Sequence, residues 1–397
     1  MITTPLTLGL VSGAAELEPT DRGVRPHRLP TWIRQQFPDP QLLGAEAQPS
    51  GVRIAFVTAA TRIELVTHPT RVVYVGTDRP RGAIDAYVDG RLALRDVLTG
   101  GDAMQLDLQT GSAIPVSGAS HTTVLAGLPA HEKRIELWLP HNETVEVVAL
   151  NSDAALGEVP DHPRLWMHHG SSISHGSNAA APSEIWPAVA ARLGGVELRN
   201  LGLGGSAVVD PFLARVMRDA PADLISVKLG INVVNFDAMR LRAFVPAVHG
   251  FLDTIRDGHP TTPLVLISPI FCGIHEHTPG PGGIDPASLG TPQVKFLATG
   301  TPGDESQGRL TLGVIRRELR SLAERRSADA HLHFLDGTEL YGEADSVDLP
   351  LPDDLHPDPA THRLIGERFA AYAFGAGGPF GGAATGQAEP FSGPTGA

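Results

Sequence analysis

The chain has 397 residues, enough for two or three domains, and 42% of them are hydrophobic, so it can bury a substantial core. Its formal net charge is −13 and no run rich in Lys or Arg occurs. This disfavours nucleic acid as a partner, because phosphate contacts need clustered cations. The single cysteine, Cys272, excludes an internal disulfide framework and a multi-cysteine zinc site.

The N-terminus makes a poor signal peptide, because no basic residue precedes its weakly apolar stretch. No run approaches the length that spans a bilayer. We therefore expect a soluble, cytoplasmic protein without a membrane partner. The sequence carries no signal for the oligomeric state.

Residues 1–160 have the residue alternation of antiparallel β structure. Six segments alternate apolar and polar residues, which is typical of strands with one buried side and one solvent-facing side. Asp89-Gly90 is a hairpin turn signal. Short strands without helical patterns predict an all-β sandwich domain, jelly-roll-like in form. A Pro-punctuated lead-in, residues 25–40, is expected to pack over the sheet. The six segments are 52–57, 62–67, 83–90, 104–109, 134–139 and 144–150.

From residue 161 the pattern changes to apolar strands that alternate with amphipathic helices. Near-continuous apolar runs are typical of a parallel sheet covered on both faces, so residues 161–374 are expected to form a doubly wound α/β domain. Residues 271–308, rich in Gly and Pro, are expected to form a long functional or mobile loop. Residues 375–397 contain eight glycines and are expected to be disordered. The expected strands are 164–170, 196–202, 223–230, 263–270 and 331–337, and the expected helices are 241–255, 314–325 and 361–374.

Polar segments follow the expected strands, at the sheet edge where ligands of open α/β proteins bind. They are "GSSIS" (170–174), "NLGLGGS" (200–206), "GIN" (230–232) and "DDLHP" (353–357). Acyl transfer needs a hydroxyl nucleophile, a base, a group that orients the base and donors for an oxyanion. Each segment can supply one of these parts, so together they predict a serine hydrolase site.

The residue types suggest a role for each position. Ser172, at a tight glycine turn, could expose its hydroxyl, and His356 could remove the hydroxyl proton as general base. Asp353, on the same loop as the histidine, could hold the imidazole tautomer. The N–H groups of Ser172 and Gly205 and the side-chain amide of Asn232 could bind the oxyanion.

In their order, these four segments resemble the sequence blocks of the SGNH (GDSL-type) hydrolases. The resemblance covers residues 164–374 and implies a flavodoxin-like three-layer α/β/α domain and ester hydrolysis without a metal or cofactor. With its β domain, the chain also resembles two-domain bacterial carbohydrate esterases of this superfamily. Carried over residue by residue, the resemblance assigns a catalytic triad of Ser172, Asp353 and His356 and an oxyanion hole of Ser172, Gly205 and Asn232.

Two neighbouring positions depart from the family pattern. Ser171 stands where the family most often has Asp, and Val233 stands where Asp usually follows the asparagine. Both neighbours support loops rather than perform the chemistry. We therefore expect altered local hydrogen bonding, with the reaction type unchanged and the substrate preference open.

Simpler interpretations of the same residues stay open. Ser172 could cap a helix, and Asp353 with His356 could lie in a solvated loop before the last helix. Gly205 could be a turn glycine and Asn232 a loop-capping amide. The four segments in order favour catalysis over these interpretations.

Other site interpretations are weaker. Asp354 is the rival of Asp353 for orienting the base. "GLGGSA" (202–207) fits the dinucleotide pattern G-x-G-x-x-A, but the next strand ends without the acidic residue that binds ribose. Segment 170–174 lacks the final glycine of the G-x-S-x-G nucleophile elbow, which disfavours an α/β-hydrolase.

A metal interpretation also fits poorly. Histidines flank the serine, and "CGIHEH" (272–277) offers further ligand types, but their spacing matches no familiar metal site. We expect the histidines to line an acyl or sugar pocket, and Trp166 and Trp186 to be core residues. The histidines that flank the serine are His168, His169 and His175.

The sequence therefore predicts a serine esterase that removes a small acyl group, such as acetyl, from a carbohydrate or similar polar metabolite. Two alternatives remain open. An acyltransferase would use the same acyl-enzyme with a different acceptor, and a non-catalytic carbohydrate-binding protein would keep the fold without the reaction.

Overall fold

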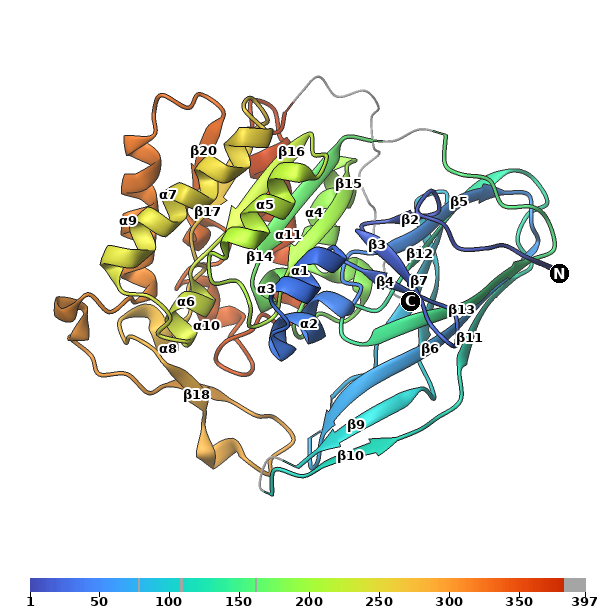
Figure 1. Cartoon of the computed structure of the whole chain (residues 1–397), viewed down its shortest axis with the longest axis horizontal. Coiled ribbons are helices and arrows are strands. Elements are labelled where there is room, and N and C mark those ends of the chain that lie inside the picture. The colour runs from blue at the N-terminus through green and yellow to red at the C-terminus, as the bar shows by residue number, and fades with distance from the viewer. Residues whose placement is uncertain (78, 108–109, 161–162, 382–397) are drawn as a thin grey trace.

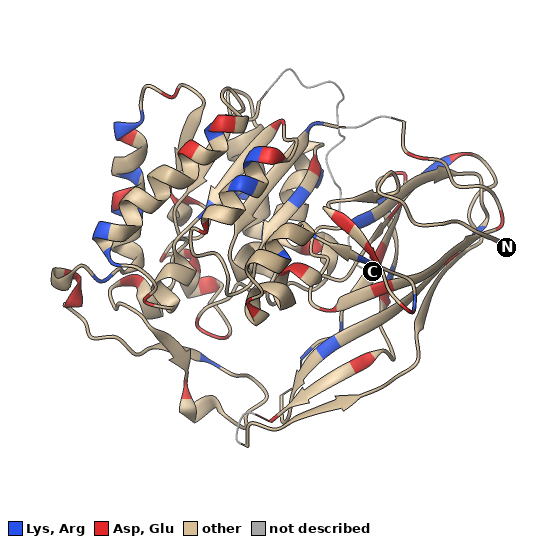
Figure 2. Ribbon diagram, in the orientation of Figure 1, with Lys and Arg blue, Asp and Glu red and all other residues tan. Residues whose placement is uncertain are grey.

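The computed structural model describes residues 1–77, 79–107, 110–160 and 163–381. A β-rich N-terminal half lies beside an α/β C-terminal half (Figure 1). Acidic and basic residues are interspersed over both halves (Figure 2). No helix in these four stretches is long and apolar enough to cross a membrane.

The described part of the N-terminal half contains an eight-stranded and a five-stranded sheet. The larger sheet has the order β10-β9-β6-β13-β4-β3, with β1 on β13 and β11 on β6, and the smaller has the order β2-β5-β12-β7-β8. Their strands are β1 (Ile2–Thr3), β2 (Val11–Ser12), β3 (Glu16–Pro19), β4 (Val24–His27), β5 (Arg53–Thr58), β6 (Arg62–Tyr74), β7 (Ala83–Val88), β8 (Arg91–Val97), β9 (Asp102–Leu106), β10 (Ala113–Val116), β11 (His121–Ala126), β12 (Lys133–Trp138) and β13 (Thr144–Ser152).

One hydrophobic core joins these two sheets. Ile63 and Leu65 of β6 pack in the same cluster as Ile54 of β5 and Leu137 of β12. The alternation seen in the sequence therefore places one side of strands such as β6 and β12 between the sheets. Asp89 and Gly90 both have positive φ and connect β7 to β8, as the turn signal predicts.

The C-terminal half contains a parallel sheet with the order β15-β14-β16-β17-β20. Numbered along the chain, this is the flavodoxin-like order 2-1-3-4-5, so the predicted fold class is confirmed. The strands are β14 (Leu165–Gly170), β15 (Glu197–Gly202), β16 (Leu224–Lys228), β17 (Leu264–Ile267) and β20 (Leu332–Leu335).

Helices cover both faces of this sheet. One core contains residues of α5 (Pro211–Asp219), α7 (Leu241–Gly258) and α9 (Leu312–Arg325). The other contains residues of α4 (Trp186–Gly194) and α11 (Pro359–Phe374). The remaining elements are the short helices α3 (Ser172–His175), α6 (Ile231–Asn235), α8 (Gly273–Glu276) and α10 (Asp345–Asp348), the hairpin β18 (Gly282–Ile284) and β19 (Phe296–Ala298), and the 3-10 turns η1 (Pro182–Glu184), η2 (Pro286–Ser288), η3 (Asp304–Gln307) and η4 (Gly337–Glu339).

The lead-in does not pack over the β sheets, in contrast to the prediction. Residues 25–27 of it belong to strand β4 of the larger sheet, and the rest forms the helix α1 (Thr31–Gln36) and the start of α2 (Pro40–Ala47), two helices that lie between the two halves (Figure 1). Ile33 and Leu42 are buried in the core of the α/β half. Pro40 is the first residue of α2, and Asp39 caps it by accepting a hydrogen bond from Leu42 N–H. The prolines therefore start helical turns here rather than keep the chain extended.

The expected disorder of residues 375–397 is wrong for residues 375–381. The Phe380 side chain is buried beside Trp166, with ring centroids 6.5 Å apart, and Arg164 donates to the Phe380 carbonyl at 2.9 Å. The buried ring and the hydrogen bonds of Phe380 therefore hold this glycine-rich segment. Residues 382–397 lie outside the described part of the chain. We propose that the junction of the two halves lies between Ser152, where β13 ends, and Leu165, where β14 begins.

Candidate active site

Ser172 is the first residue of α3, directly after strand β14. The turn needs glycine at position 170, because a Cβ there would lie 2.3 Å from Ser174 Oγ. Ser171 Oγ accepts a hydrogen bond from Ile173 N–H and caps the helix, so the structure gives the capping role to Ser171. The Ser172 side chain is left partly exposed at the carboxyl edge of the sheet.

The structure brings Ser172 together with His356, although 184 positions separate them in the chain. The Ser172 Oγ lies 2.9 Å from His356 Nε2, and His356 Nδ1 lies 2.8 Å from Asp353 Oδ2. A donor at Nδ1 and an acceptor at Nε2 fit both contacts, because a carboxylate only accepts. This arrangement can remove a proton from the serine hydroxyl.

Asp353 is held as an ionised carboxylate by four donors. Its Oδ1 accepts from the backbone N–H groups of Leu355 at 3.0 Å and His356 at 2.6 Å. Its Oδ2 accepts from His356 Nδ1 and, at 3.1 Å, from Asn178 Nδ2. Burial raises the pKa of Asp353, but the hydrogen bond and charge of His356 and the two backbone donors outweigh it, so the pKa lies below its usual value.

Three donors at this edge have no acceptor among the described residues: the backbone N–H groups of Ser172 and Gly205 and the Asn232 side-chain Nδ2. The Asn232 amide is oriented, because its Oδ1 accepts from Ala207 N–H at 3.1 Å. Gly205 adopts a positive φ of 68° next to Gly204, where a Cβ would lie 3.8 Å from Ser172 Cβ. Gly205 therefore lies on a loop beside the serine, and the Asn232 amide of α6 is bonded to the same loop through Ala207.

Asp354 does not reach the histidine. It has a positive φ of 66°, and its carboxylate pairs with Lys295 at 3.1 Å. The expected loop 271–308 carries the β18–β19 hairpin, and the Phe296 ring of β19 lies edge-to-face with His356 at 5.6 Å between centroids. Phe296 N–H also donates to the Asp353 carbonyl at 3.0 Å. This segment therefore packs against the base.

The histidines near the serine do not line a pocket, in contrast to the expectation. His168, His169 and His175 are all buried under the site. His168 bridges Ser174 and Ser226 hydroxyls at 2.7 Å each, and His169 donates to the Leu201 carbonyl at 2.8 Å. Burial lowers the pKa of each, so they are neutral structural groups. Trp166 and Trp186 are buried core residues, as predicted.

Sequence reasoning missed Asn178 and Phe296, which contact the Asp353–His356 pair. Neither stands in a sequence block, and only the fold brings them to the site. Within the described ranges, no group of three or more His, Cys, Asp or Glu side chains is arranged to hold a metal ion.

Comparison with family models identifies a family for each half of the chain. Residues 169–364 match the GDSL-like Lipase/Acylhydrolase family, and residues 10–147 match the SsfX3 N-terminal domain. The chain belongs to the SGNH (GDSL-type) superfamily. Membership of this family supports an enzyme that acts on esters. A search of curated proteins found no match.

Solved structures share both halves of this SGNH protein. The salicylyl-acyltransferase SsfX3 from a tetracycline biosynthetic pathway is 27% identical, with a TM-score of 0.74, over 90% of this chain and 92% of that one. A putative GDSL-like lipase from Bacteroides ovatus is 19% identical, with a TM-score of 0.62, over 91% and 93%. A family two carbohydrate esterase from Clostridium thermocellum is 15% identical, with a TM-score of 0.53, over 82% and 91%. The last two show the fold alone.

Proposed function

We propose that this protein is a serine esterase that forms an acyl-enzyme on Ser172. The observation that carries the proposal is the unbroken contact from the Ser172 hydroxyl through His356 to Asp353, at 2.9 and 2.8 Å. Nucleophile, base and orienting carboxylate within hydrogen-bond reach are the arrangement that acyl transfer requires.

In the first half of the reaction, Ser172 Oγ attacks the ester carbonyl carbon while His356 Nε2 takes the hydroxyl proton. The carbonyl oxygen becomes an oxyanion, which the N–H groups of Ser172 and Gly205 and the Asn232 amide stabilise. The carbon–oxygen bond to the leaving alcohol then breaks, and the imidazolium returns its proton to that oxygen. Asp353 stabilises the imidazolium while it exists.

In the second half, His356 takes a proton from an acceptor, and the acceptor oxygen attacks the acyl-enzyme. With water the product is a carboxylic acid, and with an alcohol it is a new ester. The bond between the acyl carbon and Ser172 Oγ breaks, and the imidazolium returns its proton to Oγ, so the hydroxyl of Ser172 is regenerated in both cases. These steps use side chains of the protein and need no cofactor.

The proposed substrate is an ester of a small acyl group, such as acetyl, with a carbohydrate or similar polar alcohol. Its support is fold-level likeness to the carbohydrate esterase from Clostridium thermocellum. Acyl transfer is a second candidate, because the structure that is 27% identical over 90% of the chain is called a salicylyl-acyltransferase. The N-terminal half also matches the domain family of that protein.

The test of the nucleophile is turnover of p-nitrophenyl acetate, together with labelling by a fluorophosphonate probe. We expect wild type to be active and labelled at Ser172, and Ser172→Ala to lose both. Ser177→Ala is a matched control, because Ser177 lies two residues after the same short helix and bonds other described residues through its backbone alone. Equal turnover by wild type and Ser172→Ala would refute the assignment. An inert, unlabelled wild type would favour a carbohydrate-binding protein.

A second measurement separates hydrolysis from transfer. The acyl-enzyme formed from p-nitrophenyl acetate or p-nitrophenyl salicylate is offered a sugar alcohol or a phenol in water, and products are identified by mass. Free acid as the main product at all acceptor concentrations supports the esterase. A new ester that grows with acceptor concentration, at constant p-nitrophenol release, supports the transferase.

A further inference from the structure

A glutamine of the N-terminal half reaches the loop of the proposed oxyanion hole. Gln41 lies in α2, and its Nε2 donates a hydrogen bond to the Gly204 carbonyl oxygen at 2.8 Å. Only the amide nitrogen of glutamine can donate, so this contact fixes which way the side-chain amide faces. A Cβ on Gly205 would lie 2.9 Å from the same Nε2. Gln41 therefore covers the outer side of this loop.

The bonded carbonyl belongs to the peptide group whose N–H is that of Gly205. A peptide group is planar and trans, so its C=O and its N–H point in opposite directions. A donor that holds Gly204 C=O on the outer side therefore directs Gly205 N–H to the opposite side. That N–H has no acceptor among the described residues, as expected of a donor kept for a ligand.

The preceding peptide group is fixed from the inner side. His175, on the helix that begins with Ser172, accepts from Gly204 N–H through Nδ1 at 3.2 Å. Its Nε2 donates to the His141 carbonyl at 2.8 Å, which settles the tautomer. Burial lowers the pKa of His175 well below its usual value, so the imidazole stays neutral and keeps the lone pair that accepts. Hydrogen bonds thus hold both the N–H and the C=O of Gly204.

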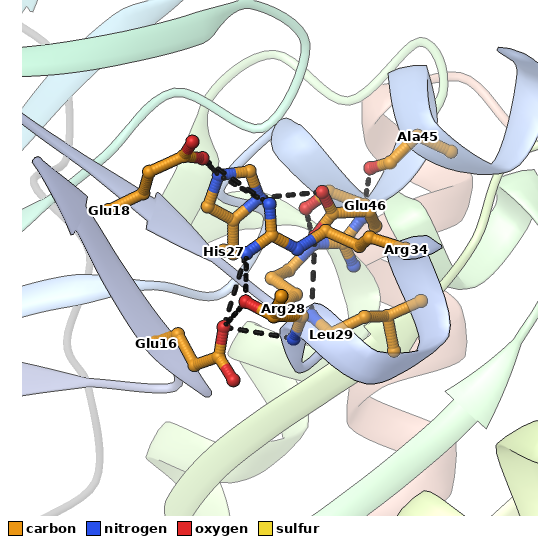
Figure 3. A network of polar contacts seen from close by, with 9 residues as sticks. Glu16, Glu18, His27, Arg28, Leu29, Arg34, Ala45 and Glu46 are labelled. Atoms are coloured by element: carbon orange, nitrogen blue, oxygen red, sulfur yellow. Dashed lines mark hydrogen bonds and ion pairs between the residues drawn. The ribbon is translucent and has the colours of Figure 1, made fainter. Parts of the chain in front are cut away.

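Helix α2 is itself anchored to the strand before this loop. The buried Arg28 guanidinium donates to the Ala45 carbonyl of α2 and, on β15, to the Asn200 carbonyl at 3.1 Å and the Gly202 carbonyl at 2.6 Å. Glu46, at the end of α2, bonds His27 Nδ1 at 2.6 Å within the same network (Figure 3). The backbone that carries Gln41 is therefore fixed relative to β15 and its loop.

We propose that Gln41 is a positioning residue of the oxyanion hole. It orients the Gly205 N–H and, by hydrogen-bonding the carbonyl of the same peptide group, makes that N–H a stronger donor to the developing oxyanion. The inference rests on the proposed acyl-enzyme function and assigns the N-terminal half a part in it. Gln41 acts through Gly205 and is not itself a catalytic residue.

The test compares three substitutions that differ in hydrogen-bond donation. Gln41→Leu removes the donor, Gln41→Glu replaces it by an acceptor facing a carbonyl, and Gln41→Lys keeps an N–H donor. We expect kcat/KM for p-nitrophenyl acetate to fall about tenfold for Leu and about 100-fold for Glu, because the Gly205 N–H is misdirected rather than removed, and removal of an oxyanion donor costs about 100- to 1,000-fold. The Lys variant should stay within about threefold of wild type. The rate of fluorophosphonate labelling should follow the same order.

Gln48→Leu is the matched control, because Gln48 ends the same helix and donates to the Asn142 carbonyl at 3.3 Å, away from the loop. It should keep wild-type rates. If Gln41 has a merely structural role, all three variants should lose kcat/KM equally, in proportion to their loss of thermal stability. That result would overturn the inference. So would wild-type rates in Gln41→Leu and Gln41→Glu. Wild type that neither turns over nor is labelled overturns the proposed function as well.

Discussion

Replacing Asp353 by asparagine should abolish most activity through the tautomer of His356. The carboxylate accepts four hydrogen bonds, two from backbone N–H groups at Oδ1 and two from His356 Nδ1 and Asn178 at Oδ2. Asparagine has one oxygen, so its NH₂ must face one of these pairs. The two backbone N–H groups can only donate, whereas the imidazole can change tautomer and accept at Nδ1. We therefore expect the NH₂ to face His356 Nδ1.

His356 Nδ1 would then accept, and its proton would move to Nε2, where it points at the Ser172 hydroxyl 2.9 Å away. An imidazole protonated at Nε2 cannot take the serine proton. Loss of the correct tautomer in such triads lowers kcat by about 10⁴, which corresponds to about 5 kcal/mol of transition-state stabilisation. The measurement is kcat for p-nitrophenyl acetate, with thermal unfolding to show that the variant is folded.

Asp354→Asn is the control for this change. The two aspartates are adjacent, but Asp354 is exposed and pairs with Lys295, so its substitution should leave kcat within about twofold, as is usual for a surface ion pair. If Asp353→Asn keeps more than a tenth of the wild-type kcat, or Asp354→Asn loses more than Asp353→Asn, the assignment of the orienting carboxylate is wrong.

Three other changes test separate parts of the structure. Gly205→Ala should lower kcat/KM for p-nitrophenyl acetate at least about tenfold, because its φ of 68° and the nearby Gln41 amide force the loop to move. Arg28→Met should lower the free energy of unfolding in urea by about 2–4 kcal/mol, because buried carbonyls lose their donor. Burial lowers the pKa of Lys228 to about 8, against 10.5 for an exposed lysine. Between pH 8 and 10.5 the unfolded chain binds more protons than the folded one, so the free energy of unfolding of wild type should rise by about 3 kcal/mol relative to that of Lys228→Met. The measurement is urea unfolding of both proteins at pH 7 and pH 10. An unchanged difference between their free energies of unfolding would contradict this.

The strands were predictable because burial on both faces leaves a strong apolar signal. In segment 263–270, for example, the four residues of β17 (Leu264–Ile267) are all apolar, and the structure buries them inside the parallel sheet. Helices α1 and α2 were not predictable in the same way. They are short and flanked by prolines, and Ile33 and Leu42 are buried against a sheet whose strands begin more than 100 positions later. Tertiary contacts, rather than local periodicity, determine them.

The residues of the site also differ in whether a local sequence signal or a tertiary contact determines their place. Ser172, Asp353 and His356 could be located because each stands in a short motif at the end of a strand or the start of a helix. Burial was not predictable for the flanking histidines, since a pocket histidine and a buried one look alike in sequence. Gln41 left no signal at all, because nothing in the sequence around an isolated glutamine shows which carbonyl it will face.

Three of the contacts between the two halves fall on the elements that carry the nucleophile and the oxyanion loop. Arg28 and Gln41 bond carbonyl groups of β15 and of the loop after it, and Ser50 Oγ donates to the His175 carbonyl at 2.5 Å on α3. The core of the α/β half also contains side chains from α1 and α2, such as Ile33. Residues 161–374 alone would therefore lose part of their own core and the outer support of Gly205. An SGNH half joined to a β domain in this way is one catalytic unit, in which the N-terminal half sets the geometry of the oxyanion side of the site.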